Sequence, residues 1–266
     1  MRDVAERWLK VYVPTARSEK QVRMSASRVH MYLAEFMGHK PLVAVKPDDI
    51  REYRLWLETH EIKPRTVLHL LADARCFFNW CVDMGLLDRS PFPRRVMPRI
   101  QEEPPDRLWP DEVEAVLRVP EPYAFVIRLA LDTGLRWGEL CRAQASHVEN
   151  GMLVVSQTKS GKVRRVPLSP ELLAEVRGRV GLLVGYSWKS PGSFANVVRR
   201  ASGVGRFHVH LLRHTFACRW VEQGGNLAAL QQILGHASIV TTQRYARLSD
   251  ESVRREAERL AAGGER

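Results

Sequence analysis

Apolar positions recur with helical spacing through the first hundred residues. In residues 66–87 apolar side chains return every three or four positions, and Gly85 supplies a stop. Residues 48–60 carry a similar stripe at Ile50, Tyr53 and Leu57. This spacing puts the apolar side chains on one face of a helix. The pattern predicts a small all-helical domain over residues 1–97.

The clearest candidate for a domain boundary is residues 90–110, which contain six prolines. Proline has no N–H donor and a fixed φ, so such a segment cannot lie inside a helix or a sheet. We expect a stiff, extended linker over residues 98–107 and a second domain over residues 108–266.

The second half has a mixed pattern. Residues 110–117 and 124–134 look helical, and the second segment ends at Gly134. In residues 151–168 two valine-rich runs flank Thr158-Lys159-Ser160-Gly161, which indicates a β-hairpin. Ser169 and Pro170 then open another helix, as N-cap and first helical residue. The predicted fold class is mainly α with a small antiparallel β-sheet (α+β), in two domains.

The charge balance points to a polyanionic partner. The 266 residues carry 41 Lys and Arg against 30 Asp and Glu, a net charge of +11 with a pI near 9.9. Residues 1–100 hold 18 basic and 12 acidic side chains, and residues 101–266 hold 23 and 18. The basic excess in both halves therefore favours nucleic acid as the partner, and an acidic membrane surface is the second candidate. An inert basic surface is the alternative that charge alone leaves open.

The four cysteines show neither a CxxC pair nor a disulfide spacing, which is typical of reduced cytosolic thiols. The first residues are charged throughout, unlike a signal peptide. No run approaches the roughly 20 apolar residues that a membrane helix needs. We expect a cytoplasmic protein.

Residues 131–140, LDTGLRWGEL, contain the first candidate site residue. Gly134 ends one helix and the next begins near Gly138, so Arg136 lies in a short turn with its guanidinium free to point away from both. The alternative is an ordinary surface arginine at a helix end, with Glu139 as its salt-bridge partner.

Residues 208–220, HVHLLRHTFACRW, contain three more. At about 100° per residue, His210, Arg213 and His214 fall on one arc of a helix that is otherwise largely apolar. A buried charge needs partners or a ligand, because leaving it unpaired costs several kcal/mol. A structural ion-pair network would also satisfy this need. A zinc site with His236 as third ligand is disfavoured, because no glutamate stands between the histidines as in HExxH and the guanidinium would repel a dication.

Residues 234–248, LGHASIVTTQRYARL, complete the set. Gly235 ends a helix and Ser238 can cap the next one, which leaves His236 in the turn and Tyr245 about two turns later. Taken alone, Tyr245 is more typical of a core residue. Its neighbours Arg244 and Arg247 add positive charge.

Together these residues fit phosphoryl transfer to a hydroxyl. Arg136 and Arg213 offer two rigid forks of donors that match the non-bridging oxygens of a phosphodiester. With His210 and His236 they would stabilise the charge that builds on those oxygens without a metal ion. Tyr245 could then attack the phosphorus and conserve the bond energy in a phosphotyrosyl link.

Two proton transfers remain to be supplied. The phenol of Tyr245, with an ordinary pKa near 10, needs a proton acceptor or a strongly positive site. The leaving sugar oxygen needs a proton, and Lys159 on the hairpin tip is a suitable donor. No cofactor is required.

The four motifs resemble the tyrosine recombinase (phage integrase) family. In order they are TGLRWGEL with Arg136, QTKSGKVRRVPL with Lys159, HLLRHTFA with His210 and Arg213, and LGHASIVTTQRY with His236 and Tyr245. The resemblance covers the whole second half. More loosely it covers the first, where KPDDIREYRLWL and FFNWCVDMGLLDRSPFP look like the family's core-binding domain.

The resemblance implies a C-shaped, two-domain clamp on double-stranded DNA with specific core sites. It implies cleavage through a 3′-phosphotyrosine, a Holliday junction and a tetrameric synapse, with no metal or nucleotide. Family roles make Arg136, Arg213 and His236 phosphate binders, His210 the proton acceptor for Tyr245, and Lys159 the general acid. Glu139 and His214 become supporting residues behind them, and residues 252–264 dock on a neighbouring protomer.

Some features depart from the family pattern. Lys162 lies three residues after Lys159, so the general acid is ambiguous, and Trp109 stands where a threonine N-cap is more common. The chain begins almost directly with its first helix and lacks an arm-binding domain, which suggests a simpler, Xer-like layout. A type IB topoisomerase-like enzyme and a DNA-binding protein of the same fold without catalysis are the alternatives.

Overall fold

The structure is a computed structural model that describes residues 1–100, 105–156, 163–184 and 190–246. The chain divides into two compact units, Met1–Glu102 and Glu103–Arg266, and each has its own hydrophobic core. The division falls inside the proline-rich segment 90–110. The bounds of the linker, residues 98–107, stay a prediction.

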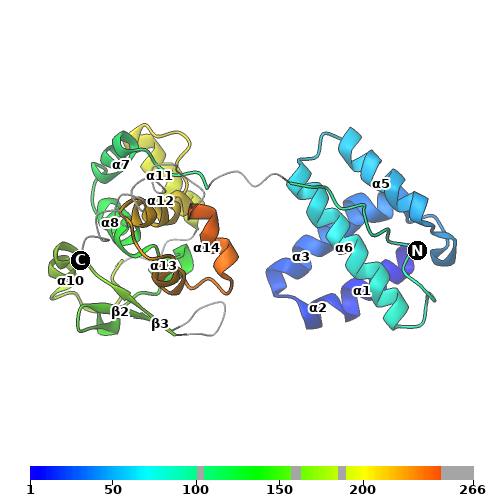
Figure 1. The fold of residues 1–266 in the computed structure, drawn as a ribbon, viewed down its shortest axis with the longest axis horizontal. Coiled ribbons are helices and arrows are strands. Elements are labelled where there is room, and N and C mark those ends of the chain that lie inside the picture. Colours follow the sequence, from blue (N-terminus) through cyan, green and yellow to red (C-terminus); the bar gives the residue numbers. More distant parts are fainter. Residues whose placement is uncertain (101–104, 157–162, 185–189, 247–266) are drawn as a thin grey trace, which may run out of the picture. The chain divides into compact units, whose positions relative to one another are not determined.

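In the first unit every described element is helical (Figure 1). The central helix is α6 (Pro64–Asp83), which packs against α1, α3, α5 and the π-helix η1. Trp8, Phe77 and Phe78 are completely buried between these helices. The other elements are α1 (Arg2–Val11), α2 (Val13–Ala16), α3 (Glu19–Arg28), η1 (Val29–Leu33), α4 (Ala34–Met37), the 3₁₀ turn η2 (Leu42–Ala44) and α5 (Pro47–Thr59). The predicted all-helical character is confirmed.

The second unit combines helices with a three-stranded antiparallel sheet in the order β1-β2-β3. Strands β2 (Met152–Val155) and β3 (Arg164–Pro167) are the two arms of the predicted hairpin. Strand β1 (Val148–Glu149) was not expected. It turns into β2 through Asn150 and Gly151, whose φ values of 51° and 75° suit a tight two-residue hairpin turn.

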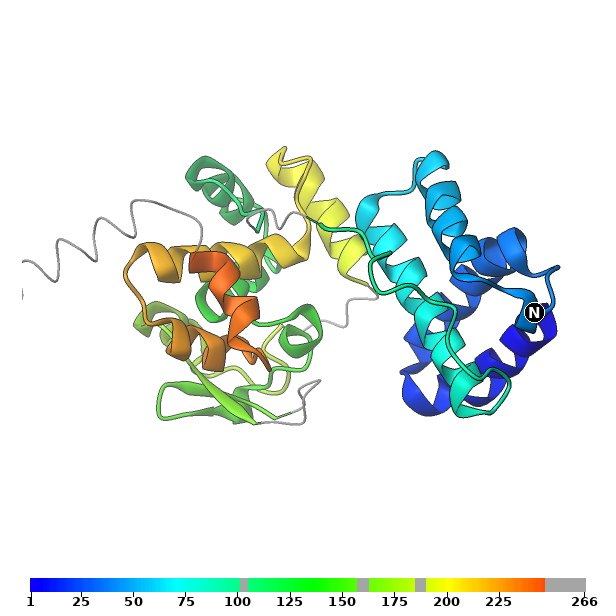
Figure 2. The ribbon, with the colours of Figure 1, turned by 45° about the vertical axis from the view of Figure 1, so that its right-hand side comes forward.

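Helix α12 (Val209–Glu222) lies at the centre of the second unit and packs against α8, α11, α13 and α14 (Figures 1 and 2). Its Leu211, Leu212 and Ala217 are completely buried, as predicted for a helix whose sequence is otherwise largely apolar around its polar arc. The other helices are α7 (Pro110–Leu117), α8 (Tyr123–Thr133), α9 (Trp137–Leu140), the 3₁₀ turn η3 (Ala145–His147), α10 (Pro170–Val176), α11 (Pro191–Ser202), α13 (Leu227–Leu234) and α14 (Ile239–Ala246).

Sequence signals for helix ends correspond to real caps. Ser169 accepts a hydrogen bond from the backbone N–H of Leu172 at the start of α10. Gly134 and Gly235 end α8 and α13 in the left-handed conformation that glycine adopts most easily. All four cysteines are free thiols. Across the described residues, no helix combines the length and the apolar sequence needed to cross a membrane.

The end of α8 gives a test of this packing. In Gly134→Ala the new Cβ would overlap the ring of Phe216 on α12, in addition to the strain of a positive φ. Gly203→Ala is the matched control, because Gly203 ends α11 with a similar φ of 75° and open space around its Cα. We expect Gly203→Ala to lose about 1–2 kcal/mol of unfolding free energy from backbone strain.

Gly134→Ala should lose about 1–3 kcal/mol more through overpacking. Urea denaturation of the full chain measures both. Equal losses would show that the second unit relaxes around Phe216 and that the close packing of α8 on α12 is not a constraint.

Candidate active site

The last turn of α13 gathers three arginine side chains from distant parts of the chain. The final carbonyls of a helix have no intrahelical donor and carry its partial negative charge. Three successive carbonyls here each accept a hydrogen bond from a guanidinium: Ile233 O from Arg164 Nε at 2.6 Å, Leu234 O from Arg213 Nη2 at 2.7 Å, and Gly235 O from Arg136 Nη2 at 3.1 Å. The structure therefore brings Arg136 and Arg213 to one place.

Arg213 is the buried member of the set, with 2% of its surface exposed. Its Nη1 also donates to Gly134 O at 2.7 Å, and its Nη2 also approaches His236 Nε2 at 3.0 Å. Burial, reinforced by the charge of Arg136, lowers the pKa of Arg213 to about 10. The guanidinium thus remains charged at neutral pH while neutral groups hold it in position.

Arg136 precedes α9 and is the more accessible member, with 35% of its side chain exposed. Its backbone N–H donates to Glu139 Oε2 at 2.8 Å, and its Nη1 donates to Glu139 Oε1 at 3.1 Å. The salt bridge between Arg136 and Glu139, which the sequence offered as the alternative, is therefore present. It coexists with the bond from Arg136 to Gly235, so the arginine is oriented rather than simply placed at the surface.

Arg164 on β3 is a residue of this cluster that sequence reasoning missed. It is buried and makes a two-pronged ion pair with Glu139, with Nη1 to Oε1 at 3.0 Å and Nη2 to Oε2 at 2.7 Å. Burial opposes ionisation of Glu139, but the hydrogen bonds from Arg164 and from the backbone N–H of Arg136, together with the charges of both arginines, outweigh it and lower the pKa of Glu139 to about 2. The signal was strand alternation, which puts Arg164 on the same inward face as Val166.

His236 lies in the turn between α13 and α14, as predicted. Arg213 Nη2 can only donate, so His236 Nε2 accepts, and its Nδ1 carries the hydrogen that is donated to Thr242 Oγ1 at 2.9 Å. Burial, followed by the charges of Arg213 and Arg136, lowers the pKa of His236 to about 4. This histidine is neutral at physiological pH.

Tyr245 on α14 is 3% exposed, and its ring lies parallel to the ring of His236 with centroids 6.5 Å apart. Its hydroxyl lies 2.8 Å from His214 Nδ1. Burial raises the pKa of Tyr245, and the charge of Arg213 opposes this shift. Burial and the neighbouring His210 and Arg213 lower the pKa of His214 to about 4.

His210 differs from the expectation that its whole helical arc is buried. It is exposed, because it belongs to the first turn of α12, at the edge of a hollow of about 400 Å³ bounded by α9 and α11. Its ring meets the ring of His214 edge-on, with centroids 4.5 Å apart. Desolvation and the charge of Arg213 lower the pKa of His210.

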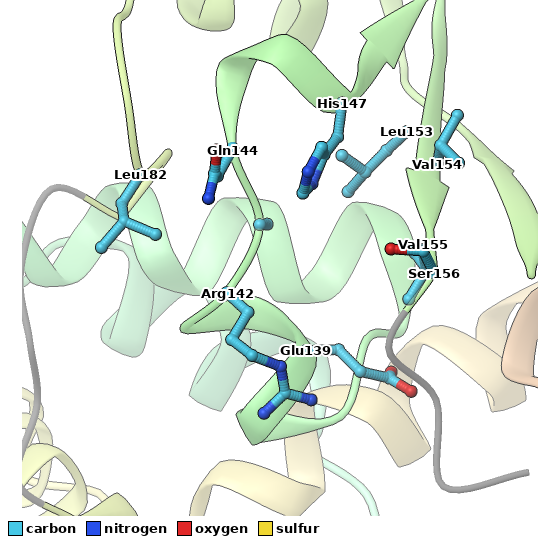
Figure 3. Close-up of a pocket in the computed structure, with 10 residues that line it drawn as sticks. Glu139, Arg142, Gln144, His147, Leu153, Val154, Val155, Ser156 and Leu182 are labelled. Carbon is cyan, nitrogen blue, oxygen red and sulfur yellow. The ribbon is translucent and has the colours of Figure 1, made fainter. Parts of the chain in front are cut away.

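Lys159 and Lys162, and with them the choice of general acid, lie outside the described residues, as do Arg247 and residues 252–264. A second pocket, of about 180 Å³, lies between α9 and β2 and has Glu139, Arg142 and His147 in its wall (Figure 3). Among the described residues, no group of three or more His, Cys, Asp or Glu side chains is arranged to hold a metal ion.

The buried pair Glu139–Arg164 supports a stability prediction. Glu139→Gln leaves the guanidinium of Arg164 buried without its counter-charge, and we expect a loss of about 3–5 kcal/mol of unfolding free energy. Adding Arg164→Met removes the orphaned charge, so the double variant should recover a large part of that loss. Urea denaturation of both variants measures the two losses. A double variant less stable than Glu139→Gln alone would contradict the idea that Glu139 stabilises the fold by neutralising the buried charge of Arg164.

The shifted histidines predict how stability depends on pH. The ordinary pKa of histidine is near 6.5, and those of His214 and His236 lie near 4 in the folded chain. The unfolded chain therefore takes up protons first. The stability contributed by these two neutral rings is complete above pH 6.5 and is lost as the pH falls through 4.

The test follows the midpoint of urea unfolding between pH 7 and pH 4. The double variant His214→Asn/His236→Gln should show a clearly flatter pH dependence than wild type. His39→Gln, at an exposed position of the first unit, is the control and should keep the wild-type slope. Identical slopes for the double variant and wild type would mean that folding does not lower the pKa of either ring.

The sequence of this chain is similar to those of known tyrosine recombinases. Tyrosine recombinase XerC of Staphylococcus saprophyticus is 26% identical over 254 residues, covering 85% of this chain and 84% of the relative. Tyrosine recombinase XerC of Staphylococcus epidermidis is 26% identical over 243 residues, with 82% of each covered.

Two solved structures show the same fold. The Tn1549 transposon integrase in complex with a circular intermediate DNA has a TM-score of 0.75 at 21% identity, covering 97% of this chain and 98% of that one. A lambda integrase dimer bound to a COC′ core site has a TM-score of 0.75 at 18% identity, covering 91% and 96%. The model of the phage integrase family matches residues 106–181 and 189–252, more than half of the chain. The chain belongs to the phage integrase family.

Proposed function

We propose that this chain is a site-specific DNA recombinase that cleaves and rejoins double-stranded DNA through a covalent bond to Tyr245. The observation that carries the proposal is convergence. Arg213 touches His236, the ring of His236 lies parallel to that of Tyr245, and Arg136 bonds to the residue just before His236. A phenol, two guanidiniums and a neutral imidazole thus belong to one cluster of neighbouring groups.

The cluster has the charge that a phosphodiester needs. Three guanidiniums meet at the end of α13, and two of them share the single carboxylate of Glu139. The rest of the hydrogen bonds that hold them go to neutral carbonyls and to the neutral imidazole of His236. Of the five N–H donors of an arginine, Arg213 uses three on described residues, and Arg136 uses two. Donors remain for non-bridging phosphate oxygens, where negative charge grows during transfer.

In the proposed reaction the phenolic oxygen of Tyr245 attacks the phosphorus, and the bond from phosphorus to the 5′ oxygen breaks. The 5′ oxygen takes a proton, for which we assign Lys159 as donor. The product is a 3′-phosphotyrosyl link and a free 5′-hydroxyl. Attack of a 5′-hydroxyl from a partner duplex reverses the step and passes through a Holliday junction. We assign His210, which is exposed and whose ring contacts the ring of His214, as a further hydrogen-bond donor to the phosphate.

The relatives support DNA as the substrate and a multimer as the working form. The XerC relatives are named as recombinases, and the lambda integrase structures are a dimer on a core site and a tetramer on a Holliday junction. We propose that this chain likewise closes its two domains around duplex DNA and assembles as a tetramer through residues 252–264. The net charge of +11 fits that partner, and the free cysteines fit a reducing cytoplasm.

The decisive variant is Tyr245→Phe, which removes one oxygen atom and leaves the buried ring. We expect it to bind its DNA site as wild type does and to form no covalent adduct. The assay incubates the full chain with nicked duplexes cut from the DNA that surrounds its own coding sequence, and detects adducts by denaturing gel electrophoresis.

The same assay tests Arg136→Gln. This variant should bind DNA but cleave it about 10²–10³-fold more slowly, because one transition-state donor is removed.

Other outcomes have definite meanings. An adduct formed by Tyr245→Phe at the wild-type rate would reject the nucleophile. Relaxation of supercoiled DNA without strand exchange would favour the topoisomerase-like alternative. A shifted DNA band with no cleavage by wild type under any condition would favour a DNA-binding protein that lacks catalysis.

A further inference from the structure

We infer that His214, rather than His210, takes the proton from Tyr245 when the phenol attacks. The inference rests on the proposed function and assigns a catalytic role to a histidine that sequence comparison alone would place behind the site. It is carried by the geometry around the buried hydroxyl.

The direction of the contact follows from the available partners. A buried hydroxyl hydrogen is expected to find an acceptor. Within the described residues, the one hydrogen bond of the Tyr245 hydroxyl is the contact of 2.8 Å with His214 Nδ1. The phenol is therefore the donor and Nδ1 the acceptor, which places the hydrogen of the second ring nitrogen on Nε2. The lone pair that a proton acceptor needs already points at the proton.

The other histidines are placed for different tasks. The Nε2 of His236 accepts from Arg213 and its Nδ1 donates to Thr242, so neither nitrogen faces the hydroxyl with a free lone pair. His210 lies one turn earlier on α12 than His214, is exposed, and meets the His214 ring edge-on. This position suits contact with bound phosphate.

The proton balance is simple. As the phenolic oxygen forms its bond to phosphorus, the O–H bond of Tyr245 breaks and the proton moves to His214 Nδ1, giving an imidazolium. The 5′ oxygen leaves with a proton from its own donor. When a 5′-hydroxyl later attacks the phosphotyrosyl link, the imidazolium returns its proton to the departing phenolate. One histidine thus serves as base and then as acid.

Bound DNA prepares His214 for this role. Without DNA the groups that face it are His208, His210 and Arg213 from the start of α12, and Arg244 and Tyr245 from α14. The positive charges among them, together with burial, disfavour protonation. A phosphate bound by Arg136 and Arg213 adds a negative charge close by, which favours the imidazolium. The base therefore becomes effective when the substrate is present.

The experiment uses His214→Asn, because an asparagine amide oxygen can occupy roughly the Nδ1 position and accept from the phenol but cannot take up its proton. His210→Asn is the matched variant one turn away. Both are assayed on a normal duplex and on a duplex whose 5′ bridging oxygen is replaced by sulfur, because a thiolate leaves without needing a proton. Lys159→Ala reports the need for a general acid.

We expect His214→Asn to bind DNA as wild type does and to form the adduct about 10²–10⁴-fold more slowly at neutral pH, the usual contribution of a positioned base. Its rate should rise with pH well above neutrality, because the phenol must ionise unaided, while the wild-type rate levels off. The sulfur substrate should restore Lys159→Ala and leave His214→Asn slow.

Three results would overturn the inference: near wild-type cleavage by His214→Asn, a slow rate that sulfur restores, or a defect that is the same at every pH. The last would indicate a structural role only. If His210→Asn shows the rising pH profile instead, the base is His210. Absence of any adduct from wild type would reject the proposed function itself, whereas an adduct from wild type and from His214→Asn alike would reject only this inference.

Discussion

The second unit is organised around the capping of one short helix by three arginines. Helix α13 ends at Gly235, and its last carbonyls receive Arg164, Arg213 and Arg136 in succession. These arginines come from β3, α12 and the turn before α9. Because a helix terminus carries only about half an elementary charge, it orients guanidiniums without cancelling them. A set of carboxylates would have fixed the same side chains and left little attraction for a phosphate.

This excess of positive charge explains the state of the aromatic groups nearby. Burial and the arginines act in the same direction on His214 and His236 and keep both rings neutral. For Tyr245 the two influences oppose each other, and burial prevails, so the phenol keeps its proton. A neutral phenol beside a neutral imidazole is a stable arrangement without substrate. In the proposed reaction a bound phosphate would change the electrostatic balance for all three groups at once, which would tie activation to DNA binding.

Much of this fold could be predicted because its signals are local. Helix α7 covers the segment with helical periodicity, and the glycines at 134 and 235 end helices with the positive φ that their positions suggested. Strand β1 was missed although its turn is a readable Asn-Gly pair, because a strand of two residues leaves almost no alternation to detect. Helical spacing placed His210 and His214 on one arc, but exposure at the first turn of a helix depends on what packs there.

The pairing inside the site was harder to predict, for a physical reason. Arg164 lies in a strand with the sequence RRVP, and nothing in the local sequence says that its partner is Glu139, 25 residues earlier. The same holds for the hydrogen bond between His214 and Tyr245, 31 residues apart. Residue type and periodicity determine which side chains turn inward. Which inward side chains meet is determined by the packing of α12, α13 and α14, and that is a property of the assembled unit.

The glycine–histidine pair at the end of α13 links the local sequence signal to the packing of the site. Gly235 has a φ of 64°, and a Cβ there would come within 3.1 Å of the Arg164 guanidinium, so glycine provides both the turn and the room for the arginine. The turn places His236 against Arg213, and the two turns of α14 bring Tyr245 back so that its ring lies parallel to the ring of His236. Thr242, on the same helix, holds His236 from the other side. The nine-residue interval between His236 and Tyr245 is thus set by helix geometry, and shortening or lengthening α14 by one residue would rotate the phenol by about 100°, away from both histidines.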